Sequence, residues 1–339
     1  MDDLDYNYVF LGSTDEYYML SYEDLNKSDC CKYVSEPFEG KSILNRILRG
    51  LHKIHMSQKI NSIIQLPFKR IWNPFLVEDY FKNGKKYCFV FFSAGPFTNH
   101  IPYGFVNVLK RRFPDSKYVV FYQDLIEHKR LVSINDFKKF CDELYSFDYK
   151  DSEKYEINYY PLVYSRLNLS DFNKLISDIY FCGAIKNRWH DIYRAYSYFS
   201  KKGCVCDFII VTRDKSIIKK YKNLPGLTFV DKFSYRHNLL HASQTKNILE
   251  LMQKNGTGYT IRACEAVALR KRLISNNKYL ERASFYSSDQ FIGFNTIESV
   301  NIQEILEPYH LNSEEEYVAE MRKLSPLSFV QRIDYDLSR

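Results

Sequence analysis

The chain has 339 residues, 45% of them hydrophobic, and a formal net charge of +7. That length allows two domains of ordinary size, each with a real hydrophobic core. No stretch of about 18 residues lacks a charged side chain, and the start of the chain is acidic. We therefore expect a cytoplasmic protein with neither a transmembrane helix nor a signal peptide.

Positive charge gathers in the first half of the chain. Ten Lys and Arg residues lie between Lys41 and Lys86, against only Glu78 and Asp79. This balance predicts an anionic partner, either a membrane surface, a pyrophosphate-linked acceptor or nucleic acid. Aromatic residues are interleaved with the basic ones, but no nucleic-acid-binding motif accompanies them, so we expect no nucleic-acid partner. The eight cysteines show no zinc spacing and are expected to be reduced thiols, mostly in the core.

The first half alternates between strand-like and helix-like segments. Short apolar runs predict strands, and apolar residues at helical spacing predict helices. The predicted strands are 8–11, 60–67, 87–93, 117–122 and 146–148, and the predicted helices are 42–56, 103–113 and 135–144.

Segment 42–56 is amphipathic, with basic residues opposite an apolar face. The simplest expectation is that the apolar face covers a sheet, and the alternative is that the basic edge lies near a membrane surface. The apolar face consists of Ile43, Leu44, Ile47, Leu48, Leu51 and Ile54.

The second half repeats the alternation. The predicted strands are 179–182, 205–211, 227–230, 247–252, 272–275 and 291–294, and the predicted helices are 189–202, 215–222, 235–242, 259–270 and 317–324. Two such series with a break near residue 168 predict the α/β class, with two Rossmann-like doubly wound domains facing a central cleft. We expect domains at 1–168 and 169–310, and a C-terminal helical segment at 311–339 that packs back on the first domain.

Two loops of the second domain have the composition of phosphate-binding loops. One follows strand 179–182 and contains Lys186 and Arg188, whose charges would neutralise a diphosphate. The other, Gly256-Thr257-Gly258-Tyr259-Thr260, precedes a helix, so that free backbone N–H groups and a positive dipole end lie at the loop.

Two charged residues follow in the helix after the second loop. Arg262 lies in its first turn, and Glu265 lies one turn later. A carboxylate at that place could accept hydrogen bonds from both hydroxyls of a ribose, and an ordinary charged helix residue is the alternative.

Residues Gly258 to Ile274, with Glu265-Ala266 in the helix and a short strand after it, resemble the donor-site signature of GT-B glycosyltransferases. More narrowly, this block and residues 148–165 look like a family of bacterial polysaccharide and lipopolysaccharide biosynthesis transferases. Two departures stand out. Thr257 replaces a Glu that many retaining members carry, and residues 270–272 are Arg-Lys-Arg where a small residue and Pro are usual.

The resemblance implies a metal-independent hexosyltransferase, with a UDP-sugar as the expected co-substrate and no other cofactor. The second domain would bind the nucleotide-sugar, and the first a glycan or lipid-linked saccharide acceptor. The setting would be bacterial surface polysaccharide synthesis, with a peripheral contact to the inner membrane face as a further expectation. The donor sugar, the acceptor and the stereochemical course do not follow from these residues.

An inverting enzyme also needs a base in the first domain. Asp124 is the first candidate, because it follows the C-terminal end of a predicted strand. His100 is the second, because the pKa of histidine suits the role. Two other classes stay open, namely a nucleotide-sugar epimerase of the same fold and a non-catalytic GT-B-like subunit that stabilises an active transferase.

Overall fold

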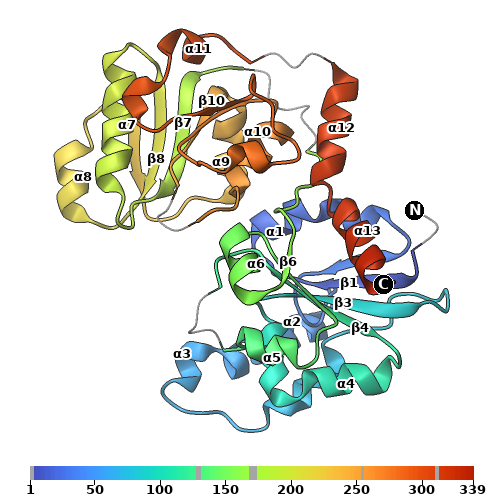
Figure 1. Ribbon diagram of the computed structural model, residues 1–339. Helices are drawn as coiled ribbons and strands as arrows, with labels where there is room; N and C mark the ends of the chain where they lie inside the picture. Colours follow the sequence, from blue (N-terminus) through green and yellow to red (C-terminus); the bar gives the residue numbers. More distant parts are fainter. Residues whose placement is uncertain (1–3, 127–130, 168–173, 253–255, 310–312) are drawn as a thin grey trace. The chain divides into compact units, whose positions relative to one another are not determined.

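The structure is a computed structural model that describes residues 4–126, 131–167, 174–252, 256–309 and 313–339. The chain forms two compact units, residues 1–160 with 326–339 and residues 161–325, each built around its own sheet (Figure 1). The boundary expected at residue 168 and the segment start expected at residue 311 fall outside the described residues.

The first unit is built on a parallel sheet with the strand order β2-β1-β3-β4-β5-β6. The strands β1, β3 and β4 are buried along almost their whole length, as expected for a parallel sheet covered on both faces. The strands are β1 (Tyr6–Leu11), β2 (Cys31–Val34), β3 (Lys86–Phe92), β4 (Lys117–Tyr122), β5 (Glu143–Ser146) and β6 (Asn158–Tyr159).

α-Helices and short 3₁₀ helices (η) connect these strands. On one face of the sheet, Phe89 and Val120 pack in a core with Phe105, Trp72 and Phe137 from the connections. The connecting elements are α1 (Glu16–Ser21), η1 (Glu23–Lys27), α2 (Ile43–Met56), α3 (Gln58–Asn61), η2 (Lys69–Phe75), η3 (Thr98–Tyr103), α4 (Phe105–Arg112), α5 (Ile134–Lys138) and α6 (Tyr149–Tyr155).

The helix α13 (Pro326–Leu337) covers part of the other face of this sheet. Its residue Phe329 is fully buried, with ring centroids 4.7 Å from Phe121 and 5.1 Å from Tyr145. The carboxylate of Asp334 accepts a 2.6 Å hydrogen bond from the hydroxyl of Tyr8 on β1. The first unit is therefore completed by residues from the far end of the sequence (Figure 1).

The second unit has a parallel sheet with the order β12-β11-β10-β7-β8-β9. The strands are β7 (Ser177–Ala184), β8 (Cys206–Val211), β9 (Leu227–Val230), β10 (Thr245–Glu250), β11 (Arg272–Ser275) and β12 (Phe291–Gly293). The connecting elements are α7 (Trp189–Lys201), α8 (Lys215–Tyr221), α9 (Tyr235–Ser243), α10 (Ile261–Ala268), η4 (Leu280–Arg282), η5 (Ile297–Ser299), α11 (Ile302–Leu306) and α12 (Glu314–Leu324).

Most predicted elements are confirmed, and the fold class of two doubly wound α/β units is confirmed with them. Gly203 follows the end of α7 with a φ of +82°, a left-handed conformation that glycine adopts without strain. The side chain of Ser313 caps α12 by accepting a hydrogen bond from Glu316 N at 3.1 Å. All eight cysteines are free thiols. Within the described residues, every helix is too short or too polar to cross a bilayer.

Three predictions for the first unit are wrong. Segment 60–67 is not a strand, because a short helix, α3, and turns occupy it. The predicted helix 135–144 ends at Lys138, and its last two residues already belong to β5. The apolar face of α2 does not cover the sheet, since all of its residues except Leu48 are more than half exposed.

Candidate functional site

The strand order of the second unit reverses between β7 and β10. The connection that follows β7 leads to β8 on one side, whereas the one that follows β10 leads to β11 on the other. At such a reversal the two loops diverge and leave a crevice at the carboxyl ends of the strands, which is where doubly wound sheets bind ligands. Both loops predicted to hold a phosphate begin here, after Ala184 and after Glu250.

The loop after β7 places Arg188 between the two strands. Its Nε donates to the carbonyl of Ala184 at 3.3 Å, and its Nη1 donates to the carbonyl of Leu251, the residue after β10. Gly183 lies under this side chain, and a Cβ there would approach Nη2 of Arg188 to 2.9 Å. Burial and the neighbouring Arg262 lower the pKa of Arg188 from its ordinary value. Lys186, in the same loop, is exposed.

The loop after β10 leads into α10 through Thr260. The Thr260 hydroxyl accepts a hydrogen bond from Arg262 N at 3.1 Å, which caps the helix, and donates one to the carboxylate of Glu250. Thr257 and Gly258, which precede this cap, are both buried. Residues 253–255, which precede the predicted loop, lie outside the described residues.

Glu250 is a buried carboxylate that is not among the predicted site residues. It is 3% exposed and also accepts a hydrogen bond from the Ser275 hydroxyl at the end of β11. Burial raises the pKa of this carboxyl, against the lowering effect of the two hydroxyl donors. Glu250 thereby joins the ends of β10 and β11 to the start of α10.

Arg262 and Glu265 form a buried ion pair within α10. Nη1 of Arg262 donates to Oε2 of Glu265, and Nη2 donates to the carbonyl of Cys182 on β7 at 3.1 Å. Oε1 of Glu265 accepts from Nδ2 of Asn238 at 3.1 Å, and the Glu265 side chain is fully buried. Burial disfavours the charged guanidinium, yet the Glu265 carboxylate raises the pKa of Arg262 above its ordinary value.

This network bears on the role expected of Glu265. Both of its carboxylate oxygens are bonded to groups of the same unit, so a bond to a ribose would require the network to open. The basic residues after α10 are also engaged. Arg270 pairs with Glu314, and Arg272 donates to the carbonyl of Glu307 at 2.8 Å. The cation best placed at the strand reversal is therefore Arg188.

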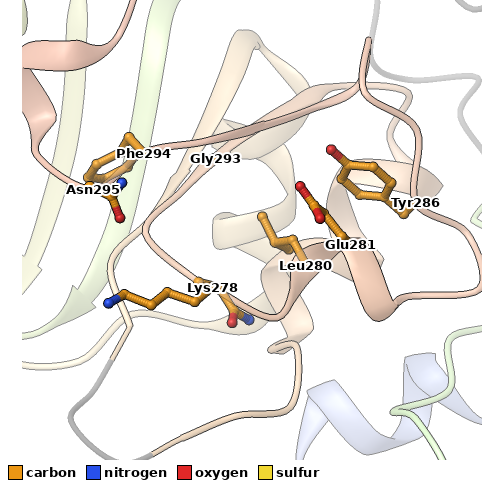
Figure 2. Close-up of a pocket in the computed structure, with 8 residues that line it drawn as sticks. Lys278, Leu280, Glu281, Tyr286, Gly293, Phe294 and Asn295 are labelled. Atoms are coloured by element: carbon orange, nitrogen blue, oxygen red, sulfur yellow. The ribbon is translucent and has the colours of Figure 1, made fainter.

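A pocket of about 410 Å³ lies at the carboxyl ends of β11 and β12. Its lining combines a cation, an acid, amides and aromatic rings, which is the mixture that recognises polar, hydroxyl-rich ligands (Figure 2). Asn277 in its wall donates to the carbonyl of Gly258 at 3.2 Å, so the wall is bonded to the glycine loop. The lining residues are Asn277, Lys278, Leu280, Glu281, Tyr286, Gly293, Phe294 and Asn295.

The two candidate bases of the first unit lie in different surroundings. His100 is fully buried, and its Nε2 lies 2.7 Å from Nε2 of His52, with the two rings stacked. Burial lowers the pKa of His100 to about 3 and that of His52 to about 4. Because His100 is out of reach of solvent, its position argues against the predicted role as a base. Asp124 follows β4, is exposed, and accepts a hydrogen bond from Leu125 N at 3.0 Å.

The histidine pair should make the protein less stable in acid. In the unfolded chain both histidines bind a proton below about pH 6.5. In the folded protein the pair stays neutral until the pH is well below that value. The free energy of unfolding that the pair contributes above pH 6.5 is therefore lost as the pH falls. The slope should reach about 1.4 kcal/mol per pH unit for each histidine. Urea unfolding at several pH values between about 4.5 and 7.5 measures it.

Two variants control this experiment. His100→Asn should flatten the pH dependence, whereas His190→Gln, at a side chain that is 85% exposed, should leave it unchanged. Equal slopes in all three proteins would show that the buried pair does not control acid stability.

Comparison with solved structures identifies proteins of similar fold. No protein-family profile and no curated protein matches the sequence. An alpha-glucosyltransferase solved with UDP and a 13-mer DNA containing a central A:G mismatch aligns over 98% of this chain and 99% of its own, with a TM-score of 0.57 and 12% identity. A structure of alpha-glucosyltransferase with UDP gives the same coverages, with a TM-score of 0.55 and 11% identity. The chain has a GT-B-like fold.

The GT-B-like fold comprises two Rossmann-like units, which agrees with the two sheets described above. At sequence identities of 11–12% the structural similarity establishes the fold alone. The chemistry has to be inferred from the side chains of the site. Of the predicted donor-site residues, the structure gathers Arg188, Thr260, Arg262 and Glu265 at the strand reversal of the second unit. No spacing rule predicts Glu250, and its only sequence signal is an acidic residue inside an apolar run.

Proposed function

We propose that this protein is a hexosyltransferase that takes its sugar from a nucleoside diphosphate donor, with a UDP-sugar as the first choice. The main support is the strand reversal of the second unit, where Arg188, the glycine loop and the N-terminus of α10 converge. Cationic groups and a helix N-terminus at a crevice are the features that bind a diphosphate. The solved structures with a similar fold were obtained with UDP.

The proposed chemistry uses positive charge to stabilise the leaving group. When the bond between the sugar carbon and the diphosphate breaks, negative charge develops on the phosphate oxygens. Arg188, Lys186 and the positive end of α10 would stabilise that charge, so the proposed reaction is metal-independent. The buried pair of Arg262 and Glu265 would fix α10 against β7 and keep this end in place.

The acceptor hydroxyl is proposed to bind the first unit. Asp124 would take the hydroxyl proton as the oxygen attacks the sugar carbon, because this exposed carboxylate stands at the carboxyl end of β4. We propose a glycan or lipid-linked saccharide as the acceptor, in the synthesis of a bacterial surface polysaccharide.

DNA with hydroxyl-bearing bases is a second candidate acceptor. It is favoured by the similar fold of an alpha-glucosyltransferase solved with DNA and by the positive charge of residues 41–77. Parallel assays with lipid-linked saccharides and with hydroxymethylated DNA separate the two acceptors. Donor turnover without any acceptor would favour an epimerase, and nucleotide binding with no turnover on any acceptor would favour a non-catalytic subunit.

Replacing Arg188 with alanine should weaken UDP binding at least about tenfold, because a charge-assisted hydrogen bond to phosphate contributes roughly 1.5–3 kcal/mol. Isothermal titration calorimetry with UDP and with UDP-glucose measures the change. The matched control is Arg194→Ala on α7, since Arg194 is half exposed and pairs with Glu298. Equal affinity of Arg188→Ala and the wild type would move the diphosphate site away from the strand reversal.

A further inference from the structure

The exposed side of α2 on the first unit is apolar. In a water-soluble domain, a helix normally turns its apolar stripe towards the core. Here five residues of that stripe are 54–75% exposed, namely Ile43, Leu44, Ile47, Leu51 and Ile54. The arrangement is the reverse of the usual one, and contiguous exposed apolar surface of this kind marks an interaction site.

The same surface continues beyond α2. Five further residues are 55–80% exposed, namely Ile63, Ile64, Phe68, Ile71 and Phe75. We call these ten residues the 43–75 surface. Outside residues 43–75, only seven large hydrophobic side chains of the described chain are exposed, and they are scattered over both units. The concentration within one short segment therefore needs a specific explanation.

Polar contacts hold α2 in this orientation. Nδ2 of Asn45 donates to the carbonyl of Glu39 at 2.6 Å, and Nη1 of Arg49 donates to the carbonyl of Phe38 at 2.7 Å. One turn further, His52 is buried against His100. Residues 45, 49 and 52 form one stripe of the helix, so the polar side faces the unit and the apolar side must face outward.

The loop after α2 is built in the same way. Nδ2 of Asn61 donates to the carbonyls of His55 and Ser57, at 2.9 and 2.8 Å, and its Oδ1 accepts from Leu66 N at 3.1 Å. These bonds satisfy three backbone groups of the loop, while Ile63 and Ile64 remain 80% and 65% exposed. The loop is therefore held by internal hydrogen bonds and exposes apolar side chains to solvent.

Charge accompanies the apolar residues. Residues 41–77 contain seven Lys and Arg residues and no Asp or Glu. Arg49 and Lys53 pair with Glu36, but Lys41, Arg46, Lys59 and Arg70 are exposed cations that border the apolar residues. The partner of this surface must therefore offer both apolar and anionic groups.

We propose that the 43–75 surface docks the protein on a bilayer that contains anionic lipid. The ten apolar side chains would enter the interface between headgroups and acyl chains, with α2 lying in the membrane plane and the cations facing lipid phosphates. Each cation near such a surface strengthens binding about fivefold. Eight of the ten side chains are isoleucine or leucine, which neither stack on bases nor hydrogen-bond to them, so lipid fits this surface better than DNA does.

The docking surface adjoins the edge where the acceptor is proposed to bind. A pocket of about 300 Å³ lies between the loop after α2 and the 3₁₀ turn after β3. Lys69 Nζ lies 3.1 Å from the Tyr103 hydroxyl in its wall. The docking itself does not rest on the proposed function, but it would place this pocket at the membrane surface. The lining residues are Met56, Asn61, Ser62, Gln65, Lys69, Asn99, Tyr103 and Leu131.

Sedimentation of the full chain with vesicles tests the proposal. The wild type should bind vesicles with about 30% phosphatidylglycerol and bind pure phosphatidylcholine at least about tenfold more weakly. The double variants Ile47→Glu with Leu51→Glu, and Ile63→Glu with Ile64→Glu, should each lose at least about tenfold in vesicle binding, because each inserts two charges into the apolar surface. The matched control is Val205→Glu on the second unit, an equally exposed residue that should leave binding unchanged.

Three outcomes would overturn the proposal. The first is a wild type that is folded by circular dichroism but does not bind anionic vesicles, or double variants that bind like the wild type. The second is salt-sensitive binding to duplex DNA that is lost in the double variants while vesicles are ignored. The third is a concentration-dependent dimer that the double variants abolish, since a second copy of the chain would then cover the surface.

Discussion

Replacing Glu265 with alanine should lower the free energy of unfolding by about 3–5 kcal/mol. The substitution removes the partner of Arg262, whose guanidinium then stays charged in a buried place beside the carbonyl of Cys182. It also leaves Asn238 without its acceptor on α10. Chemical denaturation followed by circular dichroism measures the loss.

A double variant separates the ion pair from simple packing. The double variant Arg262→Met with Glu265→Leu leaves no charge unpaired. Its free energy of unfolding should therefore fall by much less than the sum of the decreases in the two single variants. The control is Glu298→Ala, because Glu298 pairs with Arg194 on the surface and should change the midpoint little. A loss below about 1 kcal/mol for Glu265→Ala would mean that the pair is not a structural element of α10.

Replacing Asp124 with asparagine should lower kcat by about 10²–10⁴-fold and leave UDP affinity unchanged. Asparagine keeps the shape of the side chain but cannot take the proton of the acceptor hydroxyl. The carboxylate is exposed at the end of β4, so the fold should tolerate the change. The measurement is UDP release from the donor in the presence of acceptor.

The control for this prediction is Asp115→Asn, another exposed acid of the same unit, which pairs with Lys86. It should keep wild-type kcat. If Asp124→Asn stays within tenfold of the wild type, the base lies elsewhere or the sugar is transferred without one. Unchanged UDP binding in either case would leave the donor site intact, so that the two parts of the proposed function are tested separately.

The second unit was predicted well because its signals are local. Strands such as β9 and β11 are short apolar runs with charged or turn residues on both sides, and their predicted bounds agree with the structure. The caps of α10 and α12 are also local, since Thr260 and Ser313 bond residues two or three positions later. Such features depend on a few neighbouring residues and little on the rest of the fold.

The first unit shows where local signals are insufficient. The apolar stripe of α2 is plain in the sequence, but nothing local tells whether it faces a core or the outside. The decision comes from partners far along the chain, above all the stacking of His52 on His100, 48 residues later. Glu250 could not be assigned for the same reason, because its bonds to Thr260 and Ser275 arise only when β10, β11 and α10 meet.

The position of α13 has a consequence for how the chain is made. Residues 161–325 form the second unit from one continuous stretch of sequence, so this unit can fold once that stretch has left the ribosome. The first unit begins earlier but lacks Phe329 and Asp334 until the last of its segments has been synthesised. Until then one apolar face of its sheet is incompletely covered. A stop codon before residue 326 would therefore destabilise the first unit, although residues 1–160 form most of it.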